Sequence, residues 1–298
     1  MDNRGRKILI VADAGGTKTA WMVTALGSDS AVSVETPGIN ASVNSDEHIY
    51  ETIVRLRDTM ADHGLNQASD SFIIRFFGAG CNSDKTKARV ADAFNDVFGE
   101  GLIEAHYMSD LYAAAIALFG SDKGVVCILG TGSASCYYDG SAITDNIPSL
   151  GYILGDEGSG AFMGKQLLNK YYKRELSEEI KVELEHFSNM ELSHAIEMVY
   201  RSDSPGRYLA SFVPFIKLHQ HHEDISGLID DSLKLFFTNN VLKYKEIKNK
   251  GIGFAGGVAA VFSERLKELS AYYGFSRCTF IHGPIKPLFE YYLDYYLK

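Results

Sequence analysis

A strand that ends in a glycine-rich tip and returns as a second strand occurs twice in this chain. The first copy runs from residue 8 to residue 23 and the second from residue 125 to residue 138, with apolar flanks on both sides of each tip. This pattern is typical of a β-hairpin with a polar turn. The two tips, at Gly15 and Gly130, are about 115 residues apart. The internal duplication suggests two related domains that face one another across a cleft and grip one ligand between their tips.

The first tip has the residue types of a phosphate-binding loop. Gly15 and Gly16 permit backbone conformations that let successive N–H groups converge on an anion. Two hydroxyls and an ammonium stand next to them, on Thr17, Thr19 and Lys18. Asp13, at the end of the strand, would meet a hydrated Mg²⁺ carried by that anion. The alternative is a tight hairpin whose glycines serve only the turn, and this stretch by itself does not decide between the two.

The segment after the first hairpin alternates helices and strands. Apolar residues at helical spacing, with a capping sequence before them and His63-Gly64 after them, predict a helix over residues 47–62. Residues 72–77 read as a buried strand that runs into the glycine turn 78–80, and a helix comes next over residues 90–97. Strand, glycine turn and helix in succession predict an α/β domain.

Asp110 is a candidate site residue because of its place at the start of a helix. Ser109 and Asp110 precede the good helix formers of residues 111–119, so Asp110 is expected in the first turn. The helix dipole is expected to lower its pKa and to keep it ionised at neutral pH. The alternative is an aspartate that only complements the dipole.

Two further glycine-rich stretches come after the second hairpin. Residues 150–164 place Asp156 and Glu157 among glycines, although buried carboxylates are costly unless they are partnered. The alternative here is a surface loop that leads into a closely packed helix. In residues 251–259 a glycine pair stands at a strand-to-helix junction, where a flat ring or a phosphate can approach the backbone and the helix N-terminus. Close packing of strand and helix would need the same glycines.

The segment from about residue 165 to residue 244 reads as mostly helical and gives the second domain its bulk. It contains His219-Gln220-His221-His222, which lacks acids or cysteines at ligand spacing and therefore reads as a solvated helix end rather than a metal site. After Pro284 the pattern predicts a short, Tyr-rich helix.

Composition narrows the classes of protein. The chain has 298 residues, enough for two domains, and 46% of them are hydrophobic. Its formal net charge of −9 argues against nucleic acid as a partner. No apolar run has the length of a membrane helix, and residues 1–7 lead into a strand without a signal-peptide core, so a cytoplasmic protein without a membrane partner is expected. The four cysteines form no CxxC pair and read as reduced, mostly buried residues: Cys81, Cys127, Cys136 and Cys278.

Four motifs in order resemble the N-acetylglucosamine kinase group within the BadF/BadG/BcrA/BcrD-type ATPase family, part of the actin-like ATPase and sugar-kinase superfamily. They are Asp-Ala-Gly-Gly-Thr-Lys-Thr, Leu-Gly-Thr-Gly-Ser, Gly-Asp-Glu-Gly-Ser-Gly and Phe-Ala-Gly-Gly-Val. The resemblance covers nearly the whole chain and includes Gly78-Ala79-Gly80 and Ser109-Asp110.

The resemblance implies an α/β fold of two ribonuclease-H-like domains around a central nucleotide cleft. The N-terminal domain is expected over residues 1–116. The larger C-terminal domain, with a helical insertion, is expected over residues 117–298, and its last helix, about 286–298, is expected to pack back on the N-terminal domain.

The resemblance also implies roles for individual residues. ATP with Mg²⁺ is the implied cofactor, and the segment from Asp13 to Thr19 corresponds to the first phosphate motif, with Asp13 reaching the metal through water. The second phosphate motif corresponds to Gly130, Thr131, Gly132 and Ser133, and the adenosine motif to Gly256, Gly257 and Val258. Asp110 matches the catalytic base. The positions that match sugar-binding residues are Asn40, Asp110, Thr131, Gly151 and Asp156.

One segment departs from the family pattern. Kinases of the human type carry Gly-Gly-Trp-Gly where this chain has Pro148-Ser149-Leu150-Gly151. Because that tryptophan and glycine stand next to the sugar, recognition of an acetamido group does not carry over with the rest of the resemblance.

The expected function is transfer of the ATP γ-phosphoryl group to the 6-hydroxyl of an amino sugar, N-acetylglucosamine or glucosamine. One alternative is a partner-coupled ATPase such as the activators of 2-hydroxyacyl-CoA dehydratases, but residues 148–164 lack the cysteine that would hold their iron–sulfur cluster. Another is a catalytically silent sugar sensor, although Asp110 is present and no helix-turn-helix precedes the first strand. The resemblance is compatible with a homodimer, since many relatives are dimers.

Overall fold

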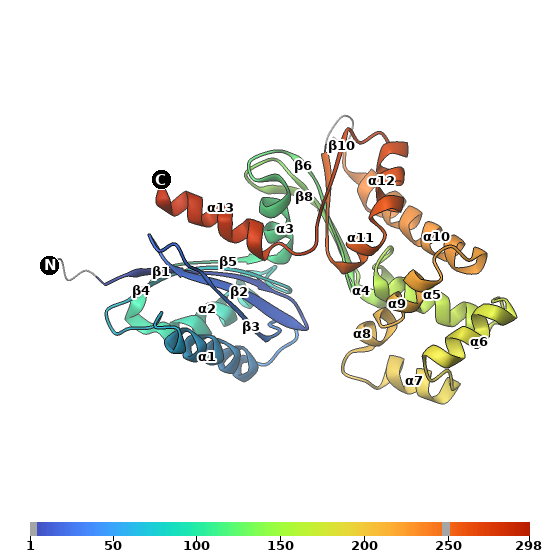
Figure 1. The fold of residues 1–298 in the computed structure, drawn as a ribbon, viewed down its shortest axis with the longest axis horizontal. Coiled ribbons are helices and arrows are strands. Elements are labelled where there is room, and N and C mark those ends of the chain that lie inside the picture. Colours follow the sequence, from blue (N-terminus) through green and yellow to red (C-terminus); the bar gives the residue numbers. More distant parts are fainter. Residues whose placement is uncertain (1–4, 246–250) are drawn as a thin grey trace. The chain divides into compact units, whose positions relative to one another are not determined.

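The computed structural model describes residues 5–245 and 251–298, which form two compact units, each built on a five-stranded sheet (Figure 1). The first unit runs to Gly120 and takes in Pro284–Lys298, and the second is Ser121–Gly283. Residues 1–4, interpreted above as free of a signal-peptide core, lie outside the described residues.

The first unit has the strand order β3-β2-β1-β4-β5, with β1, β2 and β3 antiparallel and β1, β4 and β5 parallel. Its strands are β1 (Lys7–Ala14), β2 (Lys18–Ala25), β3 (Val32–Pro37), β4 (Ser71–Gly78) and β5 (Leu102–Ser109). Its helices are α1 (Asp46–Asp62), α2 (Asp84–Phe98), the 3₁₀ turn η1 (Gly99–Gly101), α3 (Asp110–Phe119) and α13 (Ile285–Leu297). This topology is that of a ribonuclease-H-like domain.

Both faces of this sheet are covered, which explains why β1 is apolar along its length. Ile8, Ile10 and Ala12 belong to the core that includes the buried faces of α1 and α2. Leu9 and Val11 alternate with them and belong to a separate core on the other face, together with residues of α3 and α13.

Helix α13 is fixed to this sheet by apolar and polar contacts. Leu288, Phe289 and Tyr292 are buried in the core that it shares with β1 and α3. The Arg75 guanidinium on β4 donates to the Tyr296 hydroxyl and lies 5.4 Å from the centre of the Tyr292 ring. A segment distant in sequence therefore completes the first unit.

The second unit repeats the arrangement, with the order β10-β9-β6-β7-β8, β6 to β8 antiparallel and β6, β9 and β10 parallel. Its strands are β6 (Gly124–Leu129), β7 (Ser133–Tyr138), β8 (Ile143–Ile147), β9 (Gly251–Ala255) and β10 (Arg277–Ile281). The helices before β9 are α4 (Gly151–Leu154), α5 (Gly160–Tyr172), α6 (Glu178–Phe187), α7 (Leu192–Tyr200), α8 (Pro205–Ala210), α9 (Val213–Leu218), α10 (Glu223–Asn239) and the 3₁₀ turn η2 (Val241–Lys243). After β9 come α11 (Gly257–Val261) and α12 (Ser263–Tyr272). The expected duplication and class of fold, two ribonuclease-H-like units, are confirmed.

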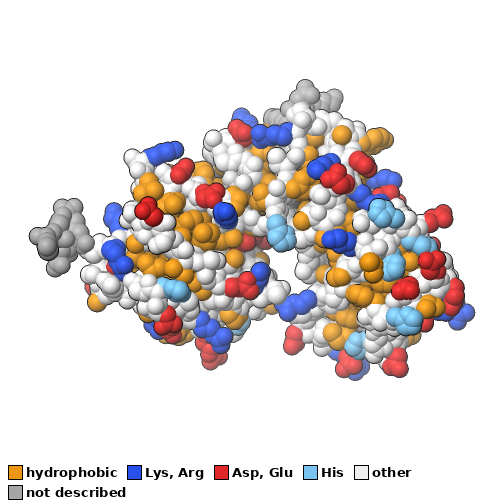
Figure 2. Space-filling model, in the orientation of Figure 1, with side chains coloured by type: hydrophobic (Ala, Val, Ile, Leu, Met, Phe, Trp, Pro, Cys, Tyr) orange, Lys and Arg blue, Asp and Glu red, His pale blue; other side chains and the backbone are white. Residues whose placement is uncertain are grey.

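The surface in view in Figure 2 carries Lys and Arg side chains interspersed with Asp and Glu, and hydrophobic side chains gather over α13. The exposed large hydrophobic residues of α13 include Tyr291, Tyr295 and Leu297. Within residues 5–245 and 251–298, no helix combines the length and the apolar character needed to cross a membrane.

Removing the Leu288 side chain tests the contribution of α13 to the first unit. Leu288→Ala should lower the free energy of unfolding of this unit by about 2–5 kcal/mol, because it leaves a cavity in a fully buried site. Trp21, the one tryptophan of the chain, is buried in the first unit, so its fluorescence reports unfolding of this unit during denaturant titration. Leu297→Ala, on the same helix but 57% exposed, should change the value by less than about 0.5 kcal/mol. Equal effects of the two variants would contradict the packing of α13.

Candidate functional site

The predicted site residues of the first unit lie at the carboxyl ends of three parallel strands. Ala14 at the end of β1 pairs with Gly78 of β4, and Gly78 pairs with Ser109 of β5. Because the three strands end in register, the glycine tip, the turn after β4 and the start of α3 lie at one edge of the sheet. This edge is where ligands bind in α/β folds.

Two carboxyl groups share this edge. Asp13 follows Leu9 and Val11 on the face of β1 that α3 covers, and Asp110 is the first residue of α3. Burial and the negative charge of Asp110 raise the pKa of Asp13 from 3.8 to about 6, against the opposing charge of Lys18. The two acids are therefore close enough to influence one another.

The position of Asp110 in the first turn of a helix is confirmed, but the expected direction of its pKa is wrong. Burial raises the pKa of Asp110, and the hydrogen bond from the Leu111 N–H to its carboxylate, 3.0 Å long, offsets only part of that shift. Loss of water outweighs the helix N-terminus because α3 begins against the covered face of the sheet. Ser109, the residue before the helix, makes no side-chain capping bond.

The first tip is closed by a hydrogen bond from the Gly15 N–H to the Lys18 carbonyl, 2.9 Å long. The Lys18 ammonium lies 2.7 Å from the Glu35 carboxylate, and both side chains are exposed. An exposed ion pair of this kind is weak, so Lys18 can exchange Glu35 for another anion at little cost. Thr19 is buried, and its hydroxyl accepts a hydrogen bond from the Ile39 N–H at 3.1 Å.

A second loop packs against the tip through Gly38. The sequence indicated only a Pro-Gly turn at this position and no role in the site. The Gly38 N–H donates to the Thr17 carbonyl at 3.2 Å. A Cβ on Gly38 would lie 2.4 Å from the Gly15 carbonyl oxygen, so a larger residue would displace the tip. Asn40 is carried on the same loop, two residues further on. The structure thus brings together Asp13, the first tip, Asn40 and Asp110 in one unit.

The second tip, in the other unit, is fixed by hydrogen bonds that its carbonyl groups accept. The Gly160 and Ala161 N–H groups, at the start of α5, donate to the carbonyls of Gly130 and Thr131 at 2.9 and 3.0 Å. These hydrogen bonds use acceptors of the tip and not the N–H groups of Thr131 and Gly132. An anion could therefore still be bound by backbone N–H groups at this tip.

Asp156 lies beside the second tip in a strained conformation. Its φ is 59°, it is 8% exposed, and its carboxylate accepts hydrogen bonds from the Ser133 N–H at 3.3 Å and the Ser149 hydroxyl at 3.2 Å. Burial raises its pKa, while these two hydrogen bonds act in the opposite direction. These two hydrogen bonds offset part of the free energy that burial of the carboxylate costs. Of the two donors, Ser149 stands in the segment that departs from the family pattern.

A cavity of about 100 Å³, lined by both polar and apolar residues, adjoins Asp156 and includes residues that the sequence analysis did not identify. Asn239 donates to the Glu157 carboxylate at 2.9 Å and so ties the end of α10 to this turn. The side-chain nitrogen of Asn240, which also lines the cavity, is buried without a hydrogen-bond partner in the described structure. No local pattern marks these two asparagines, because their neighbours come from a distant part of the chain.

Gly256, in the segment that the resemblance assigns to adenosine, and Gly151 occupy backbone positions that favour glycine. Gly256 has φ of 108°, and a Cβ there would lie 2.5 Å from the Leu129 carbonyl oxygen, so the β9–α11 junction packs on the end of β6. Gly257 and Val258 open α11 directly after it. Gly151, with φ of 73°, opens α4. All the predicted residues of the second unit thus surround the carboxyl end of β6 or the segment after β8.

A larger groove of about 430 Å³ lies elsewhere in the second unit, on α5 and α7. Its walls are mainly apolar, with Leu168, Ile196 and Val199 among them, and no aspartate or glutamate lines it. Volume alone therefore does not identify the site that the carboxylates and glycine tips mark.

The raised pKa of Asp13 predicts a pH-dependent stability. A folded-state pKa of about 6 against an ordinary 3.8 means that the stabilisation is complete below pH 3.8 and is lost as the pH rises through 6. Asp13→Asn should therefore gain stability relative to wild type between these pH values, by less than about 3 kcal/mol because the side chain is half-buried. Asp29→Asn, an exposed control, should follow the wild-type profile. Denaturant titrations read by Trp21 would measure both, and a pH-independent difference would contradict the raised pKa.

The chain is similar in sequence and in fold to known proteins. No family model matches it. Over 176 residues, 56% of this chain, it is 26% identical to the N-acetyl-D-glucosamine kinase of Dictyostelium discoideum, and the match spans 55% of that protein, about half its length.

Among the solved structures that match along the chain, two carry the same provisional assignment. One, from Porphyromonas gingivalis and assigned provisionally as an N-acetylglucosamine kinase, is 30% identical, with a TM-score of 0.86 over 97% of this chain and 99% of that one. Another of the same provisional assignment, from Chromobacterium violaceum, is 16% identical, with a TM-score of 0.75 over 97% and 99% of the two chains, and shares the fold. The 30% identity to the Porphyromonas gingivalis protein over nearly the full length of both chains shows that this chain belongs to the N-acetylglucosamine kinase family.

Proposed function

We propose that this chain is an ATP-dependent kinase that transfers the γ-phosphoryl group to the 6-hydroxyl of an amino sugar, N-acetylglucosamine or glucosamine. The observation that carries the proposal is the pair of carboxyl groups, Asp13 and Asp110, at the carboxyl edge of the first sheet. The full-length likeness to the Porphyromonas gingivalis protein supports it.

The two glycine tips are the proposed phosphate sites. Backbone N–H groups of Gly15–Thr19 and of Gly130–Ser133, together with the Lys18 ammonium, would neutralise charge on the phosphates of ATP. Gly256, Gly257 and Val258 would receive the adenosine. A loose phosphoryl-transfer transition state needs mainly alignment and charge neutralisation, which such groups supply.

Asp13 fits the role of a magnesium-facing carboxylate. Mg²⁺ prefers oxygen ligands and keeps several waters, so one protein carboxylate is sufficient. In the described part of the chain no three His, Cys, Asp or Glu side chains gather as a metal cage, which suits an ion that arrives with the nucleotide. Bound there, Mg²⁺ would offset negative charge on the phosphates.

Asp110 would orient the sugar hydroxyl and accept its proton. A carboxylate with a raised pKa is a stronger base than an ordinary aspartate, which favours this role. The remaining sugar contacts are proposed for Asn40, Thr131, Gly151 and Asp156. The Ser149 hydroxyl donates to Asp156, so the segment that departs from the family pattern contacts one of the proposed sugar-binding residues.

Release of ADP from Mg-ATP across a panel of sugars tests the proposal. N-acetylglucosamine or glucosamine should stimulate release strongly over a control without sugar, and N-acetylmuramic acid and glucose should stimulate it less. Release that ignores every sugar would indicate a partner-coupled ATPase. Nucleotide binding without any release would indicate a sensor.

Asp110→Asn tests the role of the base. Turnover should fall by about 10²–10⁴-fold while nucleotide affinity is retained, because the amide can orient the hydroxyl but cannot accept its proton. Wild-type activity should rise with pH as Asp110 ionises, at a pH above the usual carboxyl range. Asp84→Asn, also at the first position of a helix but exposed, is the matched control and should keep full turnover. Full activity of Asp110→Asn would remove Asp110 from the base role.

A further inference from the structure

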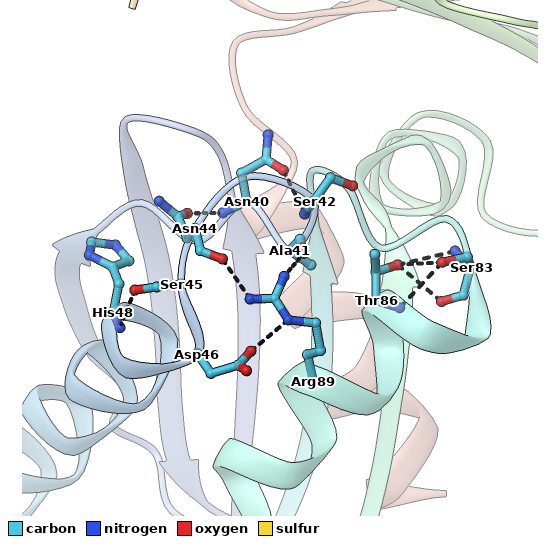
Figure 3. A network of polar contacts seen from close by, with 10 residues as sticks. All are labelled: Asn40, Ala41, Ser42, Asn44, Ser45, Asp46, His48, Ser83, Thr86 and Arg89. Carbon is cyan, nitrogen blue, oxygen red and sulfur yellow. Dashed lines mark hydrogen bonds and ion pairs between the residues drawn. The ribbon is translucent and has the colours of Figure 1, made fainter. Parts of the chain in front are cut away.

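The loop that carries Asn40 is held by one arginine from a neighbouring helix (Figure 3). Arg89 of α2 makes three hydrogen bonds, each 2.6 Å long: to the Ala41 carbonyl, to the Asn44 carbonyl and to the Asp46 carboxylate. The guanidinium binds these three acceptors at once because its N–H groups diverge in one rigid plane. A lysine ammonium, which is a single point of charge, cannot reproduce this set.

Asn44, whose carbonyl Arg89 binds, is in turn hydrogen-bonded to the backbone of Asn40. The Asn44 side chain accepts a hydrogen bond from the Asn40 N–H at 2.6 Å, and the Asn44 N–H donates to the Asn40 carbonyl at 2.9 Å. The N–H and the carbonyl of Asn40 are therefore both hydrogen-bonded to Asn44. Arg89 does not touch Asn40 but fixes the residue that does.

The Asn40 side chain is oriented by the same loop. Its carbonyl oxygen accepts the Ser42 N–H at 3.0 Å, which assigns the NH₂ group to the other end of the amide. In Figure 3 this nitrogen points away from the loop, and in the described structure it has no hydrogen-bond partner. A Cβ on Gly80 would lie 2.5 Å from the amide oxygen, so the side chain is also confined from behind.

Helix α2 gives Arg89 a fixed base. Ser83 and Thr86 form a reciprocal capping box at its N-terminus, with both backbone-to-hydroxyl bonds at 3.2 Å, as Figure 3 shows. Val90 and Phe94 are fully buried in the core of the first unit. The hydrogen bonds of the capping box join Ser83 and Thr86 to one another, so removing them weakens α2 without breaking a bond to Asn40 or Asn44.

We propose that Arg89 is a positioning residue for sugar binding, which holds the loop so that Asn40 presents its amide NH₂ to an oxygen of the sugar. The inference rests on the proposed function, in which Asn40 contacts the sugar, and it adds a residue that the family motifs do not include. It assigns to Asn40 the role of donor and to the sugar oxygen the role of acceptor.

Steady-state kinetics of the full chain with N-acetylglucosamine test this role. Arg89→Lys should raise the KM for the sugar by about tenfold or more, with kcat and the KM for ATP within about twofold of wild type. Asn44→Ala, which removes the bond to the Asn40 N–H, should act in the same direction and serves as the second variant if Arg89→Lys does not fold. Ser83→Ala should lower the melting temperature without a change in the KM for the sugar.

A double-mutant cycle separates positioning from general weakening. If Arg89 acts through Asn40, Arg89→Lys combined with Asn40→Ala should be no worse for the KM of the sugar than Asn40→Ala alone. Hydrogen exchange of the amides of residues 40–44 should become faster in Arg89→Lys and stay unchanged in Ser83→Ala.

The outcomes distinguish this inference from the proposed function. A wild-type chain without sugar-dependent turnover overturns the proposed function and the sugar role of Arg89 with it. An active wild type in which Arg89→Lys keeps the KM for the sugar, raises the KM for ATP equally, or adds independently to Asn40→Ala overturns the positioning role alone.

Discussion

Close contact between backbone segments at the carboxyl edge of the first sheet is the constraint on which the candidate site depends. The loop after β3 lies so near the first tip that Gly38 has no space for a Cβ, and Gly80 has none beside Asn40 and Ser42. Main-chain hydrogen bonds connect the same segments, such as those from Ala79 to the Ala14 carbonyl and from Ala41 to the Ala79 carbonyl. Backbone contacts thus join three loops into one frame, and the Arg89 and Asn44 side chains add to it at the loop that carries Asn40.

The electrostatics of this edge oppose its stability. Two half-buried carboxyl groups near one another bind protons more readily than exposed ones do, and both have raised pKa values. A fold gains nothing from such an arrangement without a ligand, since a neutral side chain at Asp13 would cost less. A bound cation or a hydrogen-bond donor would stabilise the two carboxylates. Arrangements that are unfavourable without a ligand are typical of sites where stability is lost for function.

The sequence predicted the features that are determined by neighbouring residues, and it missed those that depend on segments distant in the chain. Both tips, the first-turn position of Asp110 and the duplicated fold were predicted, because glycines, caps and apolar alternation act within a few residues. The pKa of Asp110 was predicted in the wrong direction because burial by other segments decides it. Arg89 was not identified because the carbonyls that it binds are 48 and 45 residues away, and an arginine on an amphipathic helix reads as a solvated residue.

The discontinuous composition of the first unit has a consequence for the order in which the protein can be completed during synthesis. Between the end of α3 and the start of α13 lie about 165 residues, which contain the whole second unit. At about 5–20 residues per second the ribosome needs roughly 8–33 s to translate them. During that time the face of β1 that bears Leu9 and Val11 has α3 but lacks α13, the second of the two helices that cover it, while the contiguous second unit can finish folding. The unit that begins first is thus the one completed last, and part of its apolar face stays uncovered until α13 has been made.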